Sequence, residues 1–356
     1  MPDVSPALLN LLSVSSPSGF EAQGQAAWAQ SIKPWADGIE NDAYGDTWAT
    51  FQGSSSEWKI LLAAHSDEIG FMIQNITDDG FIYLNRIGGS DRAIARGKRL
   101  RFLGDHGPVI GVIGNTAVHL RDKDEDKIPE IYQLFVDIGA RNRAEVEASG
   151  LRAGHPAVFV EEPTQLLNGR LTGRGIDNRV SGFVLTQVFQ RLRERGLKPR
   201  ATLIALNTVQ EEVGGYGARM AAFRFEPSLA LVLDVTHATD SPGIDKNRHG
   251  TVKLGGGPTV SHGSANHPRL VKELVQIAQK LGLSLQHEAT SISTRTDTDF
   301  IFSSKTGVPS ALVSIPLRYM HSTVETSDLA DIEQTVELLA GFVTEFDLKT
   351  DLRPPL

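Results

Sequence analysis

The amino-acid sequence predicts an α/β fold, in which a mostly parallel sheet carries helices on both faces and an all-β domain is inserted. Over residues 1–70 and 165–356, short apolar runs alternate with helical periods, which is typical of strands that helices cover on both faces. Helical periods are nearly absent between residues 71 and 164, where turn signals separate short strand candidates. The 356 residues leave room for two domains of roughly 150 residues each.

Four apolar runs supply the strands of the predicted sheet, and three amphipathic periods supply helices. Each run has seven residues, which is a common strand length and short for a helix, and each is rich in aliphatic side chains. The expected strands are residues 58–64, 201–207, 229–235 and 310–316. The expected helices are residues 185–195, 269–282 and 331–347.

Turn signals divide the middle of the chain into hairpins. Asp79-Gly80 separates the strand candidates 71–77 and 81–87, and such a dipeptide between apolar runs is a strong hairpin signal. Asp105-His106-Gly107 likewise separates residues 98–104 from 108–114. We therefore expect a β-barrel-like domain over 71–164, inserted into a domain made of 1–70 and 165–356. Further strand candidates in this segment are residues 131–139 and 156–160, and a short polar stretch near 141–149 could be helical.

The composition excludes several classes of protein. Without any cysteine, the chain has no disulfide, no thiolate zinc site and no cysteine nucleophile. Its formal net charge of −8 disfavours nucleic acids and anionic membranes as partners. The N-terminal stretch lacks the basic start of a secretory signal, and no run approaches the ~20 apolar residues of a membrane span, so we expect a cytoplasmic protein. The absence of H-E-x-x-H, G-x-S-x-G, G-x-x-x-x-G-K-[ST] and G-x-G-x-x-G argues against zincin proteases, α/β-hydrolases, P-loop NTPases and simple dinucleotide-binding folds.

Histidines and carboxylates follow the predicted strands at the points where these strands end. In an open α/β sheet, ligands bind beyond the carboxyl ends of the strands, so side chains from four strand ends can converge on one spot. A further carboxylate, Asp177, precedes a helical period, where it could also be a plain N-cap. The residues at the strand ends are His65 with Asp67, Glu211 with Glu212, Asp234, and His321.

Two histidines and three carboxylates form a ligand set that suits zinc, cobalt or manganese, and a shared carboxylate would make a two-metal hydrolytic site. The adjacent Glu211 and Glu212 diverge in an extended backbone, so one can bind metal while the other acts as general base. Asp67 lies on the same side of an extended segment as His65 and can hold the imidazole ring. Each residue alone has an ordinary alternative: a turn, a surface histidine or a solvated pair of glutamates.

Several segments, in this order and spacing, match one known family. The most specific are Ala-His-Ser-Asp-Glu-Ile-Gly-Phe at 64–71 and Val-Gln-Glu-Glu-Val-Gly at 209–214. The other matching segments are 18–21, 136–140, 177–179, 233–236, and 318–322 with Glu325. On these residues the chain resembles, over almost its whole length, the M42 family of metallo-aminopeptidases, which includes the glutamyl and the tetrahedral (TET) aminopeptidases. The resemblance implies a fold like that of the co-catalytic zinc exopeptidases.

The resemblance also implies roles for the candidate residues. Glu211 would be the general base on a metal-bridging water, and Asp67 would orient His65. Two divalent ions per subunit are implied, with zinc expected first and cobalt or manganese as alternatives. The inserted domain would mediate dimer formation, dimers could build a hollow dodecamer, and the substrates would be peptides with a free N-terminus. The implied metal ligands are His65, Asp177 and Asp234 for one ion, and Asp177, Glu212 and His321 for the other.

Two positions depart from the family's pattern. Asn178 stands where the family often has a second aspartate, and Arg295 introduces a cation where the family often has a small residue. Arg295 could therefore reshape the substrate pocket or a partner interface. His237 and His262 follow the Asp234 strand end and a glycine run, and each could line the cleft.

The ligand set alone leaves other functions open. A related two-metal deacylase that acts on N-acylated amino acids or small amides would need the same ligands. A metal-stabilised scaffold without activity would keep the ligands and lose the base, whereas Glu211 is present here. A glucanase is disfavoured because the carboxylates occupy metal-ligand positions and do not form an isolated acid/base pair.

Overall fold

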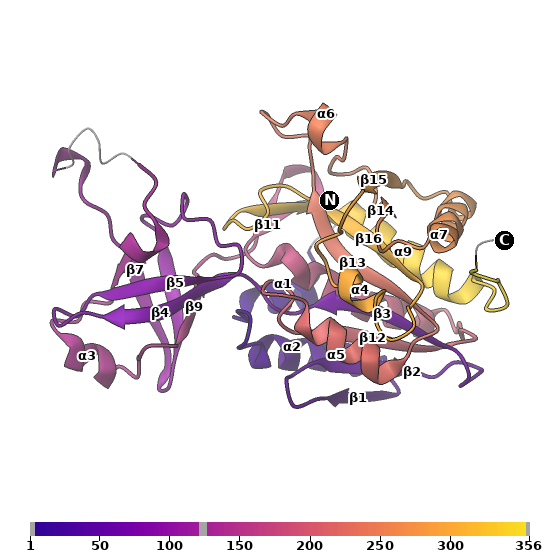
Figure 1. Cartoon of the computed structure of the whole chain (residues 1–356), viewed down its shortest axis with the longest axis horizontal. Coiled ribbons are helices and arrows are strands. Elements are labelled where there is room, and N and C mark those ends of the chain that lie inside the picture. Colours follow the sequence, from indigo (N-terminus) through magenta and orange to yellow (C-terminus); the bar gives the residue numbers. More distant parts are fainter. Residues whose placement is uncertain (1–3, 121–126, 354–356) are drawn as a thin grey trace.

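A computed structural model of the chain describes residues 4–120 and 127–353 and has two lobes (Figure 1). One lobe is built on an eight-stranded mixed sheet, and the other is a closed barrel. The chain leaves the sheet after residue 65 to form the barrel and returns to the first lobe near residue 164. Within the described part of the chain, no helix combines the length and the apolar character that crossing a membrane requires.

The four predicted strands are confirmed as four consecutive strands in the middle of the sheet. Their three pairings are all parallel, so their carboxyl ends meet at one edge. They lie in the order β12 (Thr202–Thr208), β3 (Lys59–His65), β13 (Leu229–His237) and β16 (Ser310–Leu317).

The outer strands make the sheet mixed, although four of its seven strand pairings are parallel. On one side β2 pairs antiparallel with β12, and on the other β14 pairs antiparallel with β16. These strands carry polar residues, so their sequences lack the continuous apolar run of a central strand. Their bounds are β1 (Gly38–Asn41), β2 (Thr47–Phe51), β14 (Thr259–Gly263) and β15 (Gln286–Thr290).

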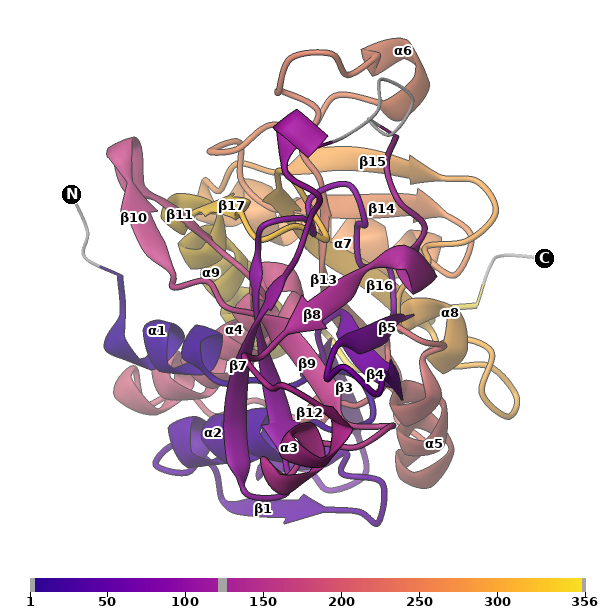
Figure 2. The same ribbon diagram turned by 90° about the vertical axis from the view of Figure 1, so that its left-hand side faces the viewer.

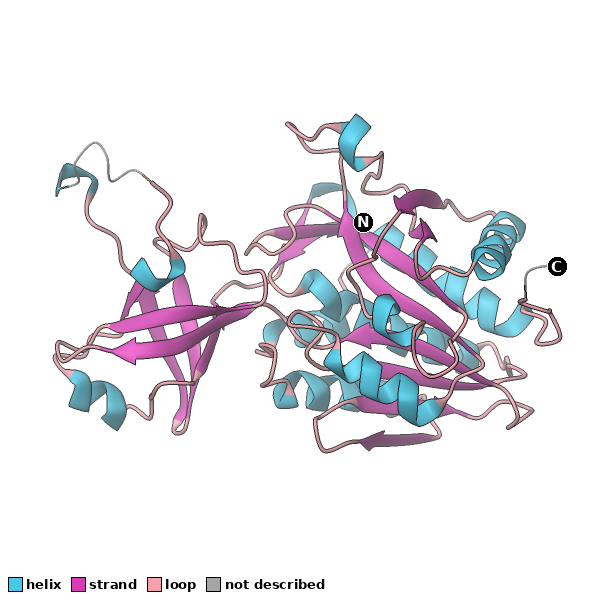
Figure 3. Cartoon of the chain, viewed as in Figure 1, coloured by secondary structure: helices cyan, strands magenta, loops and turns pink. Residues whose placement is uncertain are grey.

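Helices cover both faces of the sheet (Figure 3). The apolar sequence of strand β3 reflects burial on both faces of the sheet. Leu62 and Ala64 join the core under one layer of helices, whereas Leu61 and Ala63 join the core under the other. The helices of the first layer are α1 (Pro6–Ser13), α2 (Ala22–Ile32), α4 (Ile176–Glu194), α7 (Pro268–Leu281) and α9 (Leu329–Glu345). Those of the second are α5 (Tyr216–Phe225) and α8 (Thr298–Ile301), and a short α6 (Lys246–His249) lies apart from both layers.

The predicted helices 269–282 and 331–347 are confirmed as α7 and α9. The helix predicted over 185–195 is the C-terminal half of α4. This helix begins nine residues earlier, at Ile176, and the prediction missed its N-terminal half. That half is buried on nearly all sides, so its sequence has no polar face to reveal a helical period.

Both predicted hairpins are present in the second lobe. Strand β4 pairs antiparallel with β5 across a turn in which Gly80 has a φ of 82°, and β6 pairs with β7 across Gly107, whose φ is 112°. The barrel closes in the order β4-β5-β8-β7-β6-β9 around its own apolar core (Figure 2). The bounds are β4 (Gly70–Ile76), β5 (Ile82–Ile87), β6 (Arg99–Gly104), β7 (Gly107–Ile113), β8 (Phe135–Asp137) and β9 (Pro156–Phe159).

The barrel segment is not free of helix. Helix α3 (Arg143–Ala148) begins at Asn142, whose side chain caps it by accepting a hydrogen bond from the main-chain nitrogen of Glu145, and Val146 contributes to the barrel core. After the barrel, a small antiparallel sheet brings residues from distant parts of the chain together. Its strands are β10 (Thr164–Leu166), β11 (Arg170–Gly173) and β17 (Glu325–Asp328).

Candidate metal centre

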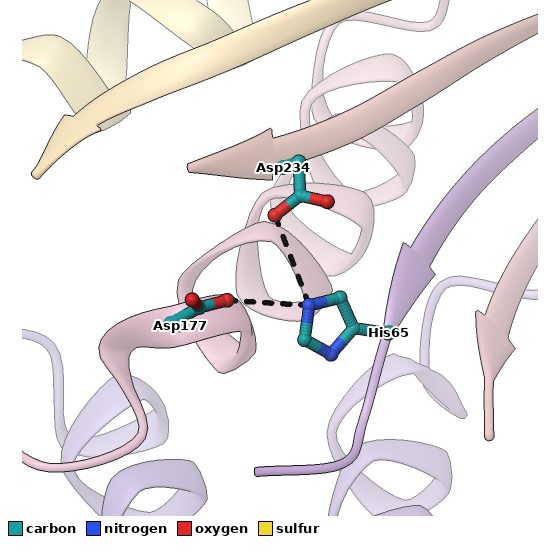
Figure 4. Close-up of side chains that lie close together, drawn as sticks. All are labelled: His65, Asp177 and Asp234. Carbon is teal, nitrogen blue, oxygen red and sulfur yellow. Dashed lines mark ion pairs between the residues drawn. The ribbon is translucent and has the colours of Figure 1, made fainter. Parts of the chain in front are cut away.

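The carboxyl edge of the four central strands gathers all the side chains that the sequence singles out for metal binding. Figure 4 shows three of them, His65, Asp177 and Asp234, which point toward one another from β3, α4 and β13. Glu211 and Glu212 follow β12 through a turn in which Gln210 has a φ of 58°, and His321 follows β16. The strand-end prediction therefore places these residues correctly in space.

Asp177 lies between the two histidines. Its Oδ1 is 3.2 Å from Nε2 of His65, and its Oδ2 is 3.4 Å from Nε2 of His321. The backbone at Asp177 is not helical, with φ −72° and ψ 107°, so the carboxylate faces the sheet edge and does not follow the course of α4. Each oxygen of one carboxylate thus faces a different imidazole, which is the geometry that a bridging ligand needs.

Two groups of side chains can each surround a cation. In the first, Nε2 of His65 lies 3.7 Å from Oδ1 of Asp234, and in the second, Nε2 of His321 lies 3.3 Å from Oε2 of Glu212. Asp177 belongs to both groups, and the candidate ligand atoms of each group lie within 4.8 Å of one another. Glu211 belongs to neither, although its Oε2 is 3.8 Å from Nε2 of His65.

The electrostatics of the site call for positive charge. Burial raises the pKa of Glu211 well above its usual range and that of Glu212 to about 7. Burial alone would lower the pKa of His321, but its hydrogen bonds with Asp177 and Glu212 outweigh that effect and raise it to about 11. Glu212 Oε1 is buried and accepts no hydrogen bond. Imidazole nitrogens and carboxylate oxygens around an unmatched negative charge fit a divalent ion such as zinc, cobalt or manganese.

Asp67 makes more contacts than the sequence suggested. Nδ1 of His65 lies 3.1 Å from the main-chain oxygen of Asp67 and 3.5 Å from its carboxylate. The same carboxylate accepts hydrogen bonds from the main-chain nitrogens of Glu211 (3.0 Å) and Glu212 (3.1 Å) and from the hydroxyl of Ser18 (2.6 Å). Asp67 therefore also fixes the turn that carries both glutamates, which residue spacing could not reveal.

Glu325 is a further residue whose role sequence reasoning missed. Its buried carboxylate accepts hydrogen bonds from the main-chain nitrogens of Asp177 (3.1 Å) and His321 (2.9 Å). One side chain on β17 thus holds the backbone of two candidate ligands. The available signal was the membership of Glu325 in the last matching segment.

We expect Glu325→Gln to weaken metal binding about 10- to 100-fold, as is usual for residues that orient metal ligands. A glutamine has one acceptor oxygen where two main-chain N–H groups need acceptors, so one of the two segments must shift. Competition with a chromophoric chelator measures the affinity, and Glu147→Gln on α3 removes the same charge in the other lobe as a control. An affinity that stays at the wild-type value would contradict this role.

Next to Asp67, Glu68 forms the centre of a buried ion cluster. Both of its oxygens bind Arg174 Nη1, at 2.7 and 2.5 Å, and Oε1 also contacts Arg179. Arg179 in turn donates to the carbonyls of Leu11 and Leu12 in α1. The cluster therefore ties α1 and α4 to the segment that carries His65.

The two departures from the family's pattern have clear positions. Asn178 is fully buried, and its Nδ2 donates a 2.9 Å hydrogen bond to the carbonyl of Leu233, so it ties the Asp177 turn to the strand that carries Asp234. Arg295 lines the cleft, a cavity of about 800 Å³, with its side chain exposed.

The two histidines expected near the cleft differ in position. His237 lines the cleft. His262 does not belong to that lining, and its Nε2 lies 2.9 Å from Nδ1 of His287 on the neighbouring strand. Of the two histidines that could line the cleft, His237 therefore does so, and His262 is an exposed residue of β14.

A loop of the barrel lobe closes one side of the site. Gly89 lines the cleft and packs so close to the imidazole of His321 that any side chain at this position would collide with Nδ1. A Cβ at Gly88, whose φ is 64°, would lie 3.3 Å from the Cβ of Glu212. Glycine is required here because the loop backbone touches two candidate ligands of the second group.

Comparison with known proteins identifies the family. The family model of the M42 glutamyl aminopeptidases matches residues 45–338. The lysyl aminopeptidase of Pyrococcus furiosus is 32% identical over 333 residues, which are 92% of this chain and 93% of that protein. The structure of a TET aminopeptidase from the marine sediment archaeon Thaumarchaeota archaeon SCGC AB-539-E09 has a TM-score of 0.91 and 32% identity, covering 97% of this chain and 96% of that chain. The TET1 peptidase of Pyrococcus horikoshii can assemble into a tetrahedron or a large octahedral shell. Its structure has a TM-score of 0.84 and 30% identity, covering 96% of this chain and 99% of that chain.

These matches extend over most of this chain and nearly the whole length of the relatives. They confirm the resemblance read from the sequence, and the metallopeptidase family implies divalent metal cofactors, for which the two groups around Asp177 provide suitable ligands. The chain therefore belongs to the M42 glutamyl aminopeptidase family and is a hydrolase that acts on peptides.

Proposed function

We propose that this enzyme is a two-metal aminopeptidase that removes N-terminal residues from peptides with a free N-terminus. The observation that carries the proposal is the shared Asp177, whose two oxygens face His65 and His321. In this proposal one ion is held by His65, Asp177 and Asp234, and the other by Asp177, Glu212 and His321. Zinc suits this donor set best, with cobalt or manganese as alternatives.

Glu211 has the position and environment of a general base. It stands beside the first group without belonging to either, and its carboxylate lines the cleft. Divalent ions at the two groups would polarise the scissile carbonyl and lower the pKa of water. Glu211 accepts a proton from the attacking water and returns it to the leaving amine, while Asp67 holds Glu211 through its main-chain nitrogen.

The barrel lobe has the features of an assembly domain. We propose that residues 71–164 form an inserted dimerisation domain and that residues 1–70 and 165–356 form the catalytic domain. Strand β7 exposes Ile110 and Val112 to solvent, at 47% and 46% of their surface, on the outside of the barrel. Apolar side chains at such positions favour contact with a second copy. Dimers could then build a larger shell, up to a dodecamer, as the tetrahedral assembly of the Pyrococcus horikoshii relative suggests.

The charge of the cleft favours a substrate with a free α-ammonium group. Four carboxylates, those of Asp177, Asp234, Glu211 and Glu212, would balance two divalent ions, and the buried carboxylate of Asp67 beside His65 adds a further negative charge. Opposite charges attract strongly in a partly dehydrated site. A two-metal deacylase, the alternative that the ligand set leaves open, would instead require an acylated nitrogen.

We expect peptides with a free N-terminus to be cleaved at least about tenfold faster than the same peptides carrying an N-acetyl group. Acetylation removes a charge-assisted contact, of the order of 1.5–3 kcal/mol, and adds bulk where the substrate should end. Release of the first residue from Leu- and Glu-initiated peptides, with and without the cap, measures the ratio. Equal or faster cleavage of the capped peptides would replace the aminopeptidase with the deacylase.

A further inference from the structure

We propose that Glu288 selects substrates whose N-terminal residue is lysine or arginine. This inference rests on the proposed aminopeptidase function and names the substrate class of the same cleft. Glu288 lies on β15 and lines the cleft that contains both candidate metal groups. No role follows for it from the ligand set or from the general base.

The position of Glu288 relative to the site is fixed by one hydrogen bond. Its Oε1 accepts a 2.7 Å bond from the hydroxyl of Thr236, which also lines the cleft. Thr236 lies two residues beyond Asp234 on β13, so both side chains emerge from the same face of the strand, about 6.6 Å apart at ~3.3 Å per residue. Glu288 therefore stands roughly one extended side chain away from the proposed reaction centre.

In the described part of the chain, the carboxylate of Glu288 pairs with no cationic side chain. Its contacts within residues 4–120 and 127–353 are with hydroxyl groups, that of Thr236 and, at 3.5 Å, that of Ser261, and it takes part in no ion pair there. Two neutral donors thus hold a half-buried carboxylate in place at the cleft. A carboxylate in such a position gains most from a cation that the ligand brings.

The cleft lining mixes apolar and polar side chains, and the strands that carry Asp234 and Glu288 contribute polar ones. Ser314, the register partner of Asp234 on β16, also lines the cleft, and its buried hydroxyl has no hydrogen-bond partner. An aliphatic side chain lying here would take water from the half-buried carboxylate of Glu288 without replacing its hydrogen bonds. The long methylene stem of lysine or arginine can reach Glu288 and place the charge there, whereas a glutamate side chain would be repelled.

Arg295 is the competing charge in the same cleft. It would favour an acidic side chain, but it is exposed, and only its main-chain nitrogen is held, by Ser293 and Asp299. An exposed guanidinium loses more conformational entropy on binding than a carboxylate that two hydroxyls already hold. The arrangement of the two groups therefore favours the cationic substrate.

Binding of free amino acids to the metal-loaded enzyme tests this assignment without depending on turnover. Calorimetry should show L-lysine binding at least about tenfold more tightly than L-norleucine, which has the same stem without the charge, and L-glutamate binding weakest. Glu288→Gln, which keeps the hydrogen bond with Thr236, should lower the affinity for lysine to that for norleucine. Glu147→Gln on α3 removes the same charge from the other lobe and should keep the preference.

Three binding results would overturn the assignment. The first is norleucine binding as tightly as lysine to the wild type. The second is Glu288→Gln weakening the binding of lysine and norleucine equally, which would make Glu288 a site for the α-ammonium group. The third is glutamate binding best and losing that advantage in Arg295→Gln, which would make Arg295 the selective residue.

Turnover separates this inference from the function on which it rests. With aminoacyl-p-nitroanilides, the ratio of kcat/KM for Lys over Leu should fall at least about tenfold in Glu288→Gln, mainly through a higher KM for Lys. An enzyme that cleaves Leu and Glu substrates but does not prefer Lys would overturn the role of Glu288 and keep the aminopeptidase. A protein that binds lysine through Glu288 and cleaves no free-amine substrate would overturn only the aminopeptidase.

Discussion

Replacing Glu211 with glutamine should lower turnover by at least about 10²-fold while both metal ions stay bound. The amide keeps the shape of the side chain but cannot accept the proton of the attacking water, and general bases commonly contribute 10²- to 10⁴-fold. Because Glu211 belongs to neither ligand group, its loss leaves the donors of both ions in place. The measurement is kcat on an aminoacyl-p-nitroanilide together with metal content by mass spectrometry.

Glu212→Gln is the matched comparison for this variant. It removes the same charge one residue further along, but from a side chain that faces His321 at 3.3 Å, so it should lower the content of the second ion. Near wild-type turnover in a Glu211→Gln enzyme that carries two ions would remove Glu211 from the role of base.

The second large effect concerns Asp177. Asp177→Ala should lose most of both ions, whereas His65→Ala should lose mainly the ion of the first group, because only Asp177 contributes a ligand to both groups. Metal content per chain, measured after gel filtration, gives the comparison, and circular dichroism checks that both variants are folded. An Asp177→Ala protein that retains two ions per chain would exclude Asp177 from the site.

The sequence predicted the centre of the fold better than its edges. The central strands are buried on both faces, so each appears in the sequence as a continuous apolar run, such as residues 58–64. Strand β15, with the sequence Gln-His-Glu-Ala-Thr, lies at the edge and is only partly buried, so nothing in its composition marks a strand. The first half of α4 was missed for the opposite reason, because burial on all sides erases the amphipathic period.

The candidate site shows the same division. The strand-end rule located His65, Asp234 and His321, since these positions follow from the parallel order of the sheet. The rule could not find Glu288 or Glu325. Glu288 bonds to a residue more than 50 positions away in the sequence, and Glu325 to one more than 140 positions away. Contacts of that range depend on how the outer strands pack, which residue spacing does not encode.

The glycine loop of the barrel makes the two lobes mechanically interdependent. Gly89 packs against His321, a residue outside any strand whose φ of 61° must be held by its surroundings. Glu325 holds the main-chain nitrogen of His321, and the barrel loop packs against its imidazole ring. It follows that deleting the barrel would not leave an active minimal peptidase, because the deletion would remove the loop that packs against His321. The barrel thus helps to hold one candidate ligand in place, even though it supplies no side chain to the proposed chemistry.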